Sequence, residues 1–170
     1  MSWREAVRTV EDWPQPGVNF LDLNPCFDNP ELMGEIMLEL ERAVPPGVTH
    51  FAGIEARGLA LAAILANRLY AGFIPIRKAG KLPPPTLRLP YKLEYGEAEL
   101  EIPHIYHPRQ VVLVDDVLAT GGTAEAAVGL LRRSGAVVLG GLFVLSVDGL
   151  GGSALLGSLG VPHTVLGDRC

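Results

Sequence analysis

The chain has 170 residues, of which 48% are hydrophobic and 19% charged, and its formal net charge at pH 7 is −5. This length and apolar content predict one globular domain with an ample core. The acidic balance argues against nucleic acid and anionic membrane surfaces as partners, and no apolar run is long enough to span a bilayer.

The first predicted element is a short helix at the N-terminus, because Ser2 and Glu5 match a capping box that would start a helix through about Val10. This segment carries charges too early for a secretory signal, so we expect a cytoplasmic protein. Two cysteines, Cys26 and Cys170, are too few for a disulfide framework, and we assign them no role.

The next predicted helix follows a loop rich in proline and glycine. Asn29 suits its N-cap and Pro30 its first position, and one apolar stripe continues to about Val44. Beyond it, short apolar runs alternate with helical patterns. The predicted strands are residues 50–54, 73–77, 99–102, 111–114, 137–147 and 164–166, and the predicted helices are residues 58–70, 124–134 and a short one after residue 153. Residues 78–97 are predicted to be a long irregular segment. The alternation predicts an α/β fold with a mainly parallel sheet and helices on both faces.

The segment VVLVDDVLATGGT, residues 111–123, carries the clearest chemical signal. Its apolar run predicts a strand buried on both faces, and Asp115 and Asp116 come at the carboxyl end, where open α/β sheets place their ligands. The glycines of the following turn let amides converge on an anion, and the next helix adds its dipole. The predicted phosphate-binding residues are Ala119, Thr120, Gly121, Gly122 and Thr123. An ordinary capped βα turn is the alternative interpretation.

This segment resembles the phosphoribosyl pyrophosphate signature of the type I phosphoribosyltransferases. FAGIEARG at residues 51–58 and RKAGKLPPPTLRLPYKLEYGEAELEI at residues 77–102 resemble the adenine phosphoribosyltransferases among them. The resemblance implies the type I phosphoribosyltransferase fold in a single domain of residues 1–170. Within it, residues 1–47 would form an N-terminal hood and helix, and residues 78–97 a flexible lid.

The resemblance also implies a reaction, in which the phosphoribosyl group passes from phosphoribosyl pyrophosphate to adenine and yields AMP and pyrophosphate. Asp115 and Asp116 would hold the ribose hydroxyls, directly or through metal-bound water, and residues 119–123 would anchor the 5′-phosphate. The cofactor would be Mg²⁺, bound mainly through the substrate. The implied pyrophosphate contacts are the Glu55–Ala56 peptide, expected to be cis, together with Arg57 and Lys81. Glu94 is the candidate for proton exchange with the base.

The string PQPGVNFLDLNP, residues 14–25, resembles the family's base-binding segment. Phe20 would stack on the purine, and the backbone of Val18 and Asn19 would read its edge. Many members carry arginine where this chain has Leu21, which bears on base preference. The resemblance further implies a homodimer.

Two alternatives stay open: an enzyme for another purine such as xanthine, and a regulator that binds phosphoribosyl pyrophosphate without chemistry. The lid with Glu94 and the short acidic segment before the first core strand favour an enzyme. His104 and His107 have a metal-like spacing, but no third ligand is evident in the sequence, so we assign no metal there.

Overall fold

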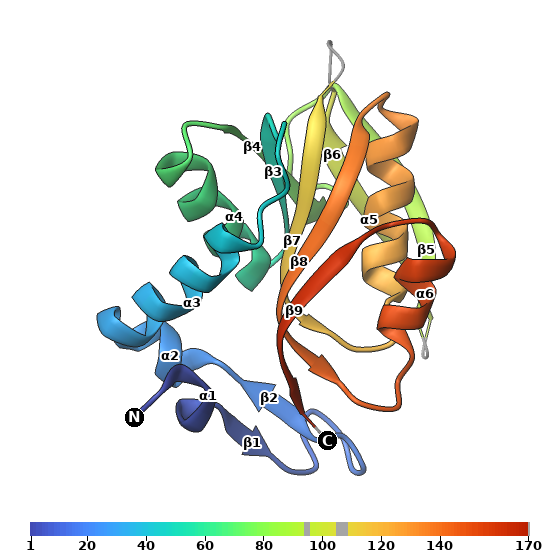
Figure 1. The fold of residues 1–170 in the computed structure, drawn as a ribbon. Helices are drawn as coiled ribbons and strands as arrows, with labels where there is room; N and C mark the ends of the chain where they lie inside the picture. Colours follow the sequence, from blue (N-terminus) through green and yellow to red (C-terminus); the bar gives the residue numbers. More distant parts are fainter. Residues whose placement is uncertain (94–95, 105–108, 170) are drawn as a thin grey trace. The chain divides into compact units, whose positions relative to one another are not determined.

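The computed structural model describes residues 1–93, 96–104 and 109–169 (Figure 1). Three residues singled out from the sequence, Glu94, His107 and Cys170, lie outside these ranges. The chain divides into two compact units, residues 1–42 and residues 43–170. In the described part of the chain, no helix is both long and apolar enough to cross a membrane.

The first unit combines helices with a two-stranded antiparallel sheet. Its elements are α1 (Trp3–Ala6), β1 (Arg8–Val10), β2 (Phe20–Asp22), α2 (Asn24–Asp28) and α3 (Pro30–Arg42). The capping box forms, since the Ser2 amide donates to Glu5 Oε2 at 2.8 Å, but the predicted helix through Val10 is wrong. Residues 8–10 pair instead with β2, a long-range contact that no local pattern announces. The start of α3 at Pro30 is confirmed, with Asn29 Oδ1 accepting the amide of Glu31 at 2.9 Å.

The second unit is built on a seven-stranded sheet. Its elements are β3 (His50–Ile54), α4 (Arg57–Arg68), β4 (Gly72–Lys78), β5 (Thr86–Leu93), β6 (Gly96–Pro103), β7 (Gln110–Leu118), α5 (Gly122–Arg133), β8 (Val137–Val147), α6 (Gly152–Ser158) and β9 (His163–Arg169). The strand order is β5-β6-β4-β3-β7-β8-β9. The five strands from β4 to β9 in this order run parallel, while β6 pairs antiparallel with both β4 and β5. The predicted α/β fold with a mainly parallel sheet is confirmed.

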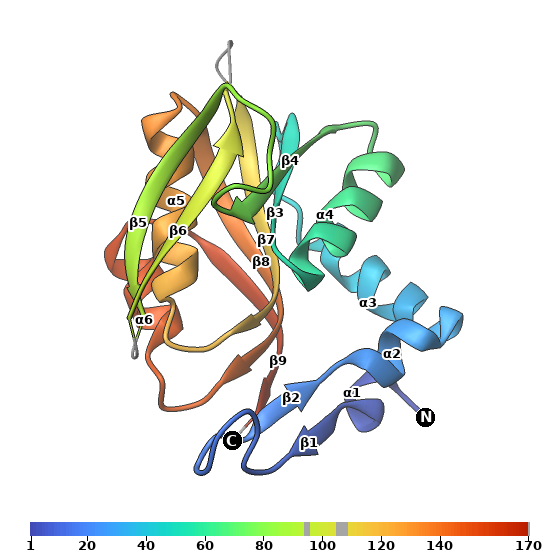
Figure 2. The ribbon, with the colours of Figure 1, turned by 180° about the vertical axis from the view of Figure 1, so that it is seen from behind.

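Helices cover both faces of this sheet, with α4 on one side and α5 and α6 on the other (Figures 1 and 2). Gly53 faces α4, because a Cβ atom there would lie 2.8 Å from the Cβ of Ala62. Ala52 and Ile54 belong to the core that α5 covers. Burial on both faces explains why the central strands read as continuous apolar runs.

The predicted irregular segment of residues 78–97 needs correction. Lys78 ends β4, residues 79–85 form a loop, and β5 begins at Thr86 as the edge strand of the sheet. Leu87, Leu89 and Tyr91 alternate along β5 and pack against the core on the α5 side. Pro90 argued against a strand here, because proline cannot donate a backbone hydrogen bond. An edge strand tolerates proline, since one row of its amides has no neighbouring strand to pair with.

Candidate functional site

The two motifs that suggested a phosphate site meet at one edge of the sheet. Because β3 and β7 are parallel neighbours, with Gly53 opposite Val114, the residues that follow these positions lie side by side. Arg57 begins α4, and its Nη2 lies 2.6 Å from Asp116 Oδ2. The glycine at position 58 lets the first turn of α4 lie close to β7, since a Cβ atom there would lie 2.7 Å from Asp115 Oδ1. The predicted convergence of Arg57 with the two acids is confirmed, although β7 runs to Leu118 rather than ending before Asp115.

The two acids occupy different environments. Asp116 is buried and paired with Arg57, while Asp115 Oδ1 accepts the backbone amide of Asp116 at 2.9 Å. Burial raises the pKa of Asp115 well above its ordinary value, and the neighbouring charge of Asp116 raises it further. Burying the charged form of Asp115 therefore costs stability, which is typical of a carboxylate kept for ligand binding rather than for stability.

We expect Asp115→Asn to raise the melting temperature of the ligand-free, magnesium-free protein. The group's pKa is higher in the folded state, so the wild type loses stability as pH rises through that pKa, and the variant has no such loss. At pH 8 the gain should be about 2–4 °C, the shift that about 1 kcal/mol produces in a chain of this size, and it should shrink toward pH 4. Calorimetry measures it. Glu11→Gln, at an exposed residue after β1, is the control, and equal gains in both variants would contradict the assignment.

The turn after β7 has the backbone form of an anion site. Gly121 has φ of +86°, and a Cβ atom there would lie 3.0 Å from the Cα of Gly152. Gly152, at the start of α6, supports the turn by donating its amide to the carbonyl of Ala119 at 3.0 Å. The first amides of α5 have no carbonyl partner within the helix, and they carry the positive end of its dipole. Residues 119–123 therefore form a turn able to bind phosphate, and Gly152 is a supporting residue that the sequence did not reveal.

The turn between β3 and α4 has the predicted cis peptide between Glu55 and Ala56. The Glu55 side chain points to β4, where its Oε2 accepts hydrogen bonds from Arg77 Nε at 3.1 Å and from the Lys78 amide at 3.0 Å. The hydrogen bond from Arg77 holds the pKa of Glu55 below its ordinary value despite partial burial. The Glu55 carboxylate thus connects the end of β3 to β4. A ligand at this turn would therefore contact the backbone of Glu55 and Ala56 rather than the Glu55 side chain.

The base-binding candidates lie in the first unit. Trp13 and Val18 close a turn, in which Val18 O accepts the Trp13 amide at 3.0 Å and the Val18 amide donates to Gln15 O at 3.2 Å. Asn19 is exposed, and Phe20 begins β2 with its ring 4.4 Å from the Trp13 ring at an edge-to-face angle of 70°. Both backbone groups of Val18 are therefore used within this turn, and only the second lone pair of its carbonyl oxygen is left to contact a base.

Leu21, the residue that bears on base preference in the sequence analysis, is buried. The adjacent Asp22 is paired with Arg8, whose Nε donates to Asp22 Oδ2 at 3.2 Å from the neighbouring strand β1. Asp22 Oδ1 accepts the amide of Asn24 at 2.9 Å. The sequence did not reveal Arg8, because its contact depends on the pairing of β1 with β2.

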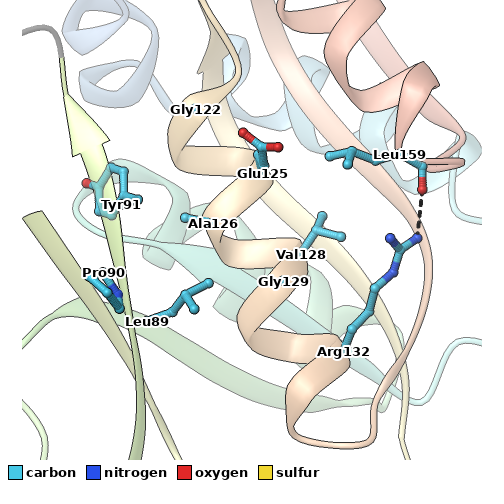
Figure 3. A pocket seen from close by; sticks show the side chains of 10 residues that line it. All are labelled: Leu89, Pro90, Tyr91, Gly122, Glu125, Ala126, Val128, Gly129, Arg132 and Leu159. Atoms are coloured by element: carbon cyan, nitrogen blue, oxygen red, sulfur yellow. Dashed lines mark hydrogen bonds between the residues drawn. The ribbon is translucent and has the colours of Figure 1, made fainter.

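A pocket of about 530 Å³ lies between the edge strand β5 and helix α5 (Figure 3). Its lining comprises Leu89, Pro90, Tyr91, Gly122, Glu125, Ala126, Val128, Gly129, Arg132 and Leu159. Arg132 donates to the Leu159 carbonyl at 3.0 Å, and Leu89 reaches toward Gly129, where a Cβ atom would lie 3.2 Å from Leu89 Cδ2. Because Arg57, Asp115 and Asp116 do not line it, this pocket is separate from their cluster.

Among the described residues, no group of three or more His, Cys, Asp or Glu side chains is placed to hold a metal ion. Asp115 and Asp116 supply two neighbouring carboxylates. A pair of this kind suits Mg²⁺, which keeps several waters and binds through one or two carboxylates together with substrate phosphates.

Comparison with known proteins agrees with this geometry. Residues 28–145 match the model of the phosphoribosyl transferase domain family. An adenine phosphoribosyltransferase of Azorhizobium caulinodans is 46% identical over 161 residues, which cover 92% of this chain and 89% of that protein. The crystal structure of adenine phosphoribosyltransferase from Rhodothermus marinus superposes with a TM-score of 0.91 at 39% identity, covering 98% of this chain and 96% of the other. The Saccharomyces cerevisiae enzyme, in complex with an imino-altritol bisphosphate and adenine, gives a TM-score of 0.88 at 36% identity, with 96% of each chain covered.

Proposed function

The chain belongs to the phosphoribosyl transferase family, among its adenine phosphoribosyltransferases, and we propose that it transfers the phosphoribosyl group of phosphoribosyl pyrophosphate to adenine, giving AMP and pyrophosphate. The observation that carries this proposal is the meeting of Arg57 with Asp116 beside the turn of residues 119–123. This edge combines a cation, two carboxylates and a helix N-terminus, which match pyrophosphate, ribose hydroxyls and a 5′-phosphate respectively.

In the proposed mechanism, a ring nitrogen of adenine displaces pyrophosphate at the anomeric carbon of the ribose. Residues 119–123 hold the 5′-phosphate, and Asp115 and Asp116 orient the ribose by accepting hydrogen bonds from its hydroxyls, so that the reacting atoms are aligned. Arg57 and Lys81 neutralise charge that develops on the departing pyrophosphate, beside the backbone of Glu55 and Ala56. Glu94 exchanges a proton with the base.

Mg²⁺ is the proposed cofactor. Asp115 and Asp116 would hold it, directly or through water, with the phosphate oxygens of the substrate completing its shell. When bound, the ion would offset negative charge on the pyrophosphate.

On the base side, we propose that Phe20 stacks on the purine while Val18 and Asn19 present backbone groups to its edge. The ion pair of Arg8 with Asp22 supports an ordered base-binding segment with leucine at position 21. We further propose that the lid, residues 78–97, closes over bound substrates, that the enzyme is a homodimer and that it acts in the cytoplasm.

The test is incubation with phosphoribosyl pyrophosphate, Mg²⁺ and adenine. We expect AMP and pyrophosphate in equal amounts, and the double variant Asp115→Asn/Asp116→Asn should make neither at the wild-type rate. A regulator would instead bind phosphoribosyl pyrophosphate and return it unchanged. That second outcome, with a folded and magnesium-supplied wild type, would reject the enzyme.

A further inference from the structure

Glu101 is a fully buried carboxylate that the proposed reaction does not use. It lies on β6, is 0% exposed, and is flanked by the buried residues Leu100 and Ile102. The alternation of the strand predicts an outward-facing, solvated side chain. The loop of residues 79–85 covers that face instead, and Glu101 Oε1 accepts the backbone amides of Lys81 at 2.6 Å and of Leu82 at 2.7 Å.

Its second oxygen faces a cation. Arg88, opposite Glu101 on β5, places its Nε 3.1 Å from Glu101 Oε2. Burial alone would raise the pKa of Glu101, but the amides of Leu82, Gly80 and Lys81, together with the charge of Arg88, outweigh it and lower the pKa. The carboxylate is therefore ionised at neutral pH. A buried ion of this kind is rarely the most stabilising choice for a strand, because an apolar residue avoids the cost of desolvation.

What Glu101 holds is the backbone on either side of the Lys81 side chain. By accepting the amides of Lys81 and Leu82, Glu101 fixes the peptide groups before and after the Lys81 Cα. The Lys81 side chain itself is exposed. The same strand also fixes the start of this loop, since the Ala79 amide donates to the carbonyl of Glu99 at 2.9 Å.

Contacts across neighbouring strands also connect Glu101 with the turn of Glu55 and Ala56. On the other side of β6 it pairs in register with Arg77 of β4, and Arg77 donates to Glu55, the residue of the cis peptide. A short series of contacts thus relates the backbone of Lys81 to the backbone of Glu55 and Ala56. Both ends of this series are groups to which we assign pyrophosphate.

We propose that Glu101 is a positioning residue for the leaving group, holding the loop of residues 79–85 so that Lys81 is presented to pyrophosphate. This inference rests on the proposed function. Glu101 touches no substrate in this account and acts only through Lys81. Its loss should therefore affect pyrophosphate and phosphoribosyl pyrophosphate, and should leave adenine binding unchanged.

The test is Glu101→Gln, which keeps the size of the side chain and removes its charge. We expect the inhibition constant of pyrophosphate and the KM of phosphoribosyl pyrophosphate to rise by about tenfold, in the range for one weakened charge-assisted contact. The KM of adenine should stay within about twofold of the wild type. Glu99→Gln is the matched control, because Glu99 lies on the same strand and its Oε2 is 3.8 Å from Nη1 of the same Arg88. Its side chain is 39% exposed, in contrast to the buried Glu101.

A double variant separates positioning from general structure. In a Lys81→Ala background, Glu101→Gln should add less than about twofold to either constant, because the group through which it acts is already gone. A full tenfold effect in that background would overturn the proposal. So would unchanged constants in a folded Glu101→Gln protein whose wild type makes AMP, whereas a wild type that makes no AMP rejects the proposed function itself.

Hydrogen exchange on the wild type keeps the proposal testable if Glu101→Gln does not fold. The amides of Lys81 and Leu82 should exchange slowly in the ligand-free protein, because both are bonded to a buried carboxylate. Exchange at these two amides as fast as in an exposed loop would overturn the proposal.

Discussion

Replacing Glu94 with glutamine is expected to lower kcat with adenine by about 10²–10⁴-fold, the range that a positioned acid–base group contributes. Glutamine keeps the size and hydrogen-bonding groups of the side chain but cannot ionise, so proton exchange with the purine is lost as the glycosidic bond forms. Binding of phosphoribosyl pyrophosphate should change little. Single-turnover and steady-state assays with adenine measure the effect on the chemical step.

Glu99→Gln is a suitable comparison for this variant, because Glu99 is a partly exposed acid on β6 that has no role in the proposed reaction. It should retain the wild-type kcat. An undiminished rate in Glu94→Gln would remove Glu94 from the acid–base role, and an equal loss in both variants would point to a general structural effect rather than to proton exchange.

Replacing Gly122 with valine is expected to weaken the binding of AMP and of phosphoribosyl pyrophosphate by about 10²-fold or more. Each charge-assisted hydrogen bond lost from the bound phosphate is worth about 1.5–3 kcal/mol. A Cβ atom at Gly122 meets nothing closer than Thr120 Oγ1 at 3.9 Å, so the fold should accept the side chain. The valine would then occupy the approach of phosphate to the amides of the turn. Calorimetric titration with AMP measures the loss.

The neighbouring glycine should respond in the opposite way. Gly121→Val puts a β-branched residue at φ of +86°, 3.0 Å from Gly152, and should destabilise the fold before binding can be measured. Gly157→Val, at an open position of α6, is the neutral control for adding a valine to a helix. Wild-type AMP affinity in a folded Gly122→Val protein would refute the assignment of the phosphate turn.

Much of the second unit could be predicted from local pattern, because its central strands are short apolar runs and its ligand turn is a compact motif. The strand β8 occupies residues 137–147 as predicted, and Arg57 meets Asp116 because parallel neighbours end at one edge. The edge strand β5 could not be recognised in the same way, since Pro90 suggested a loop, and its apolar alternation is explained only by its packing against α5.

Long-range contacts account for the residues that the sequence did not reveal. Arg8 pairs with Asp22 through a two-stranded ladder, and Arg77 reaches Glu55 across neighbouring strands. Glu101 was the hardest to foresee, because strand alternation predicts it in solvent and only the covering loop buries it. In each case a charged side chain finds its partner on an element distant in sequence, and neither periodicity nor motif spacing contains that information.

Competition between purine bases tests whether the enzyme prefers adenine. An equimolar mixture of adenine, hypoxanthine, guanine and xanthine is incubated with Mg²⁺ and limiting phosphoribosyl pyrophosphate, and the nucleotides formed are quantified. Discrimination by hydrogen bonds to the purine edge predicts AMP in at least about tenfold excess over every other nucleotide. A mixture of nucleotides without preference, or a dominant product other than AMP, would contradict adenine specificity.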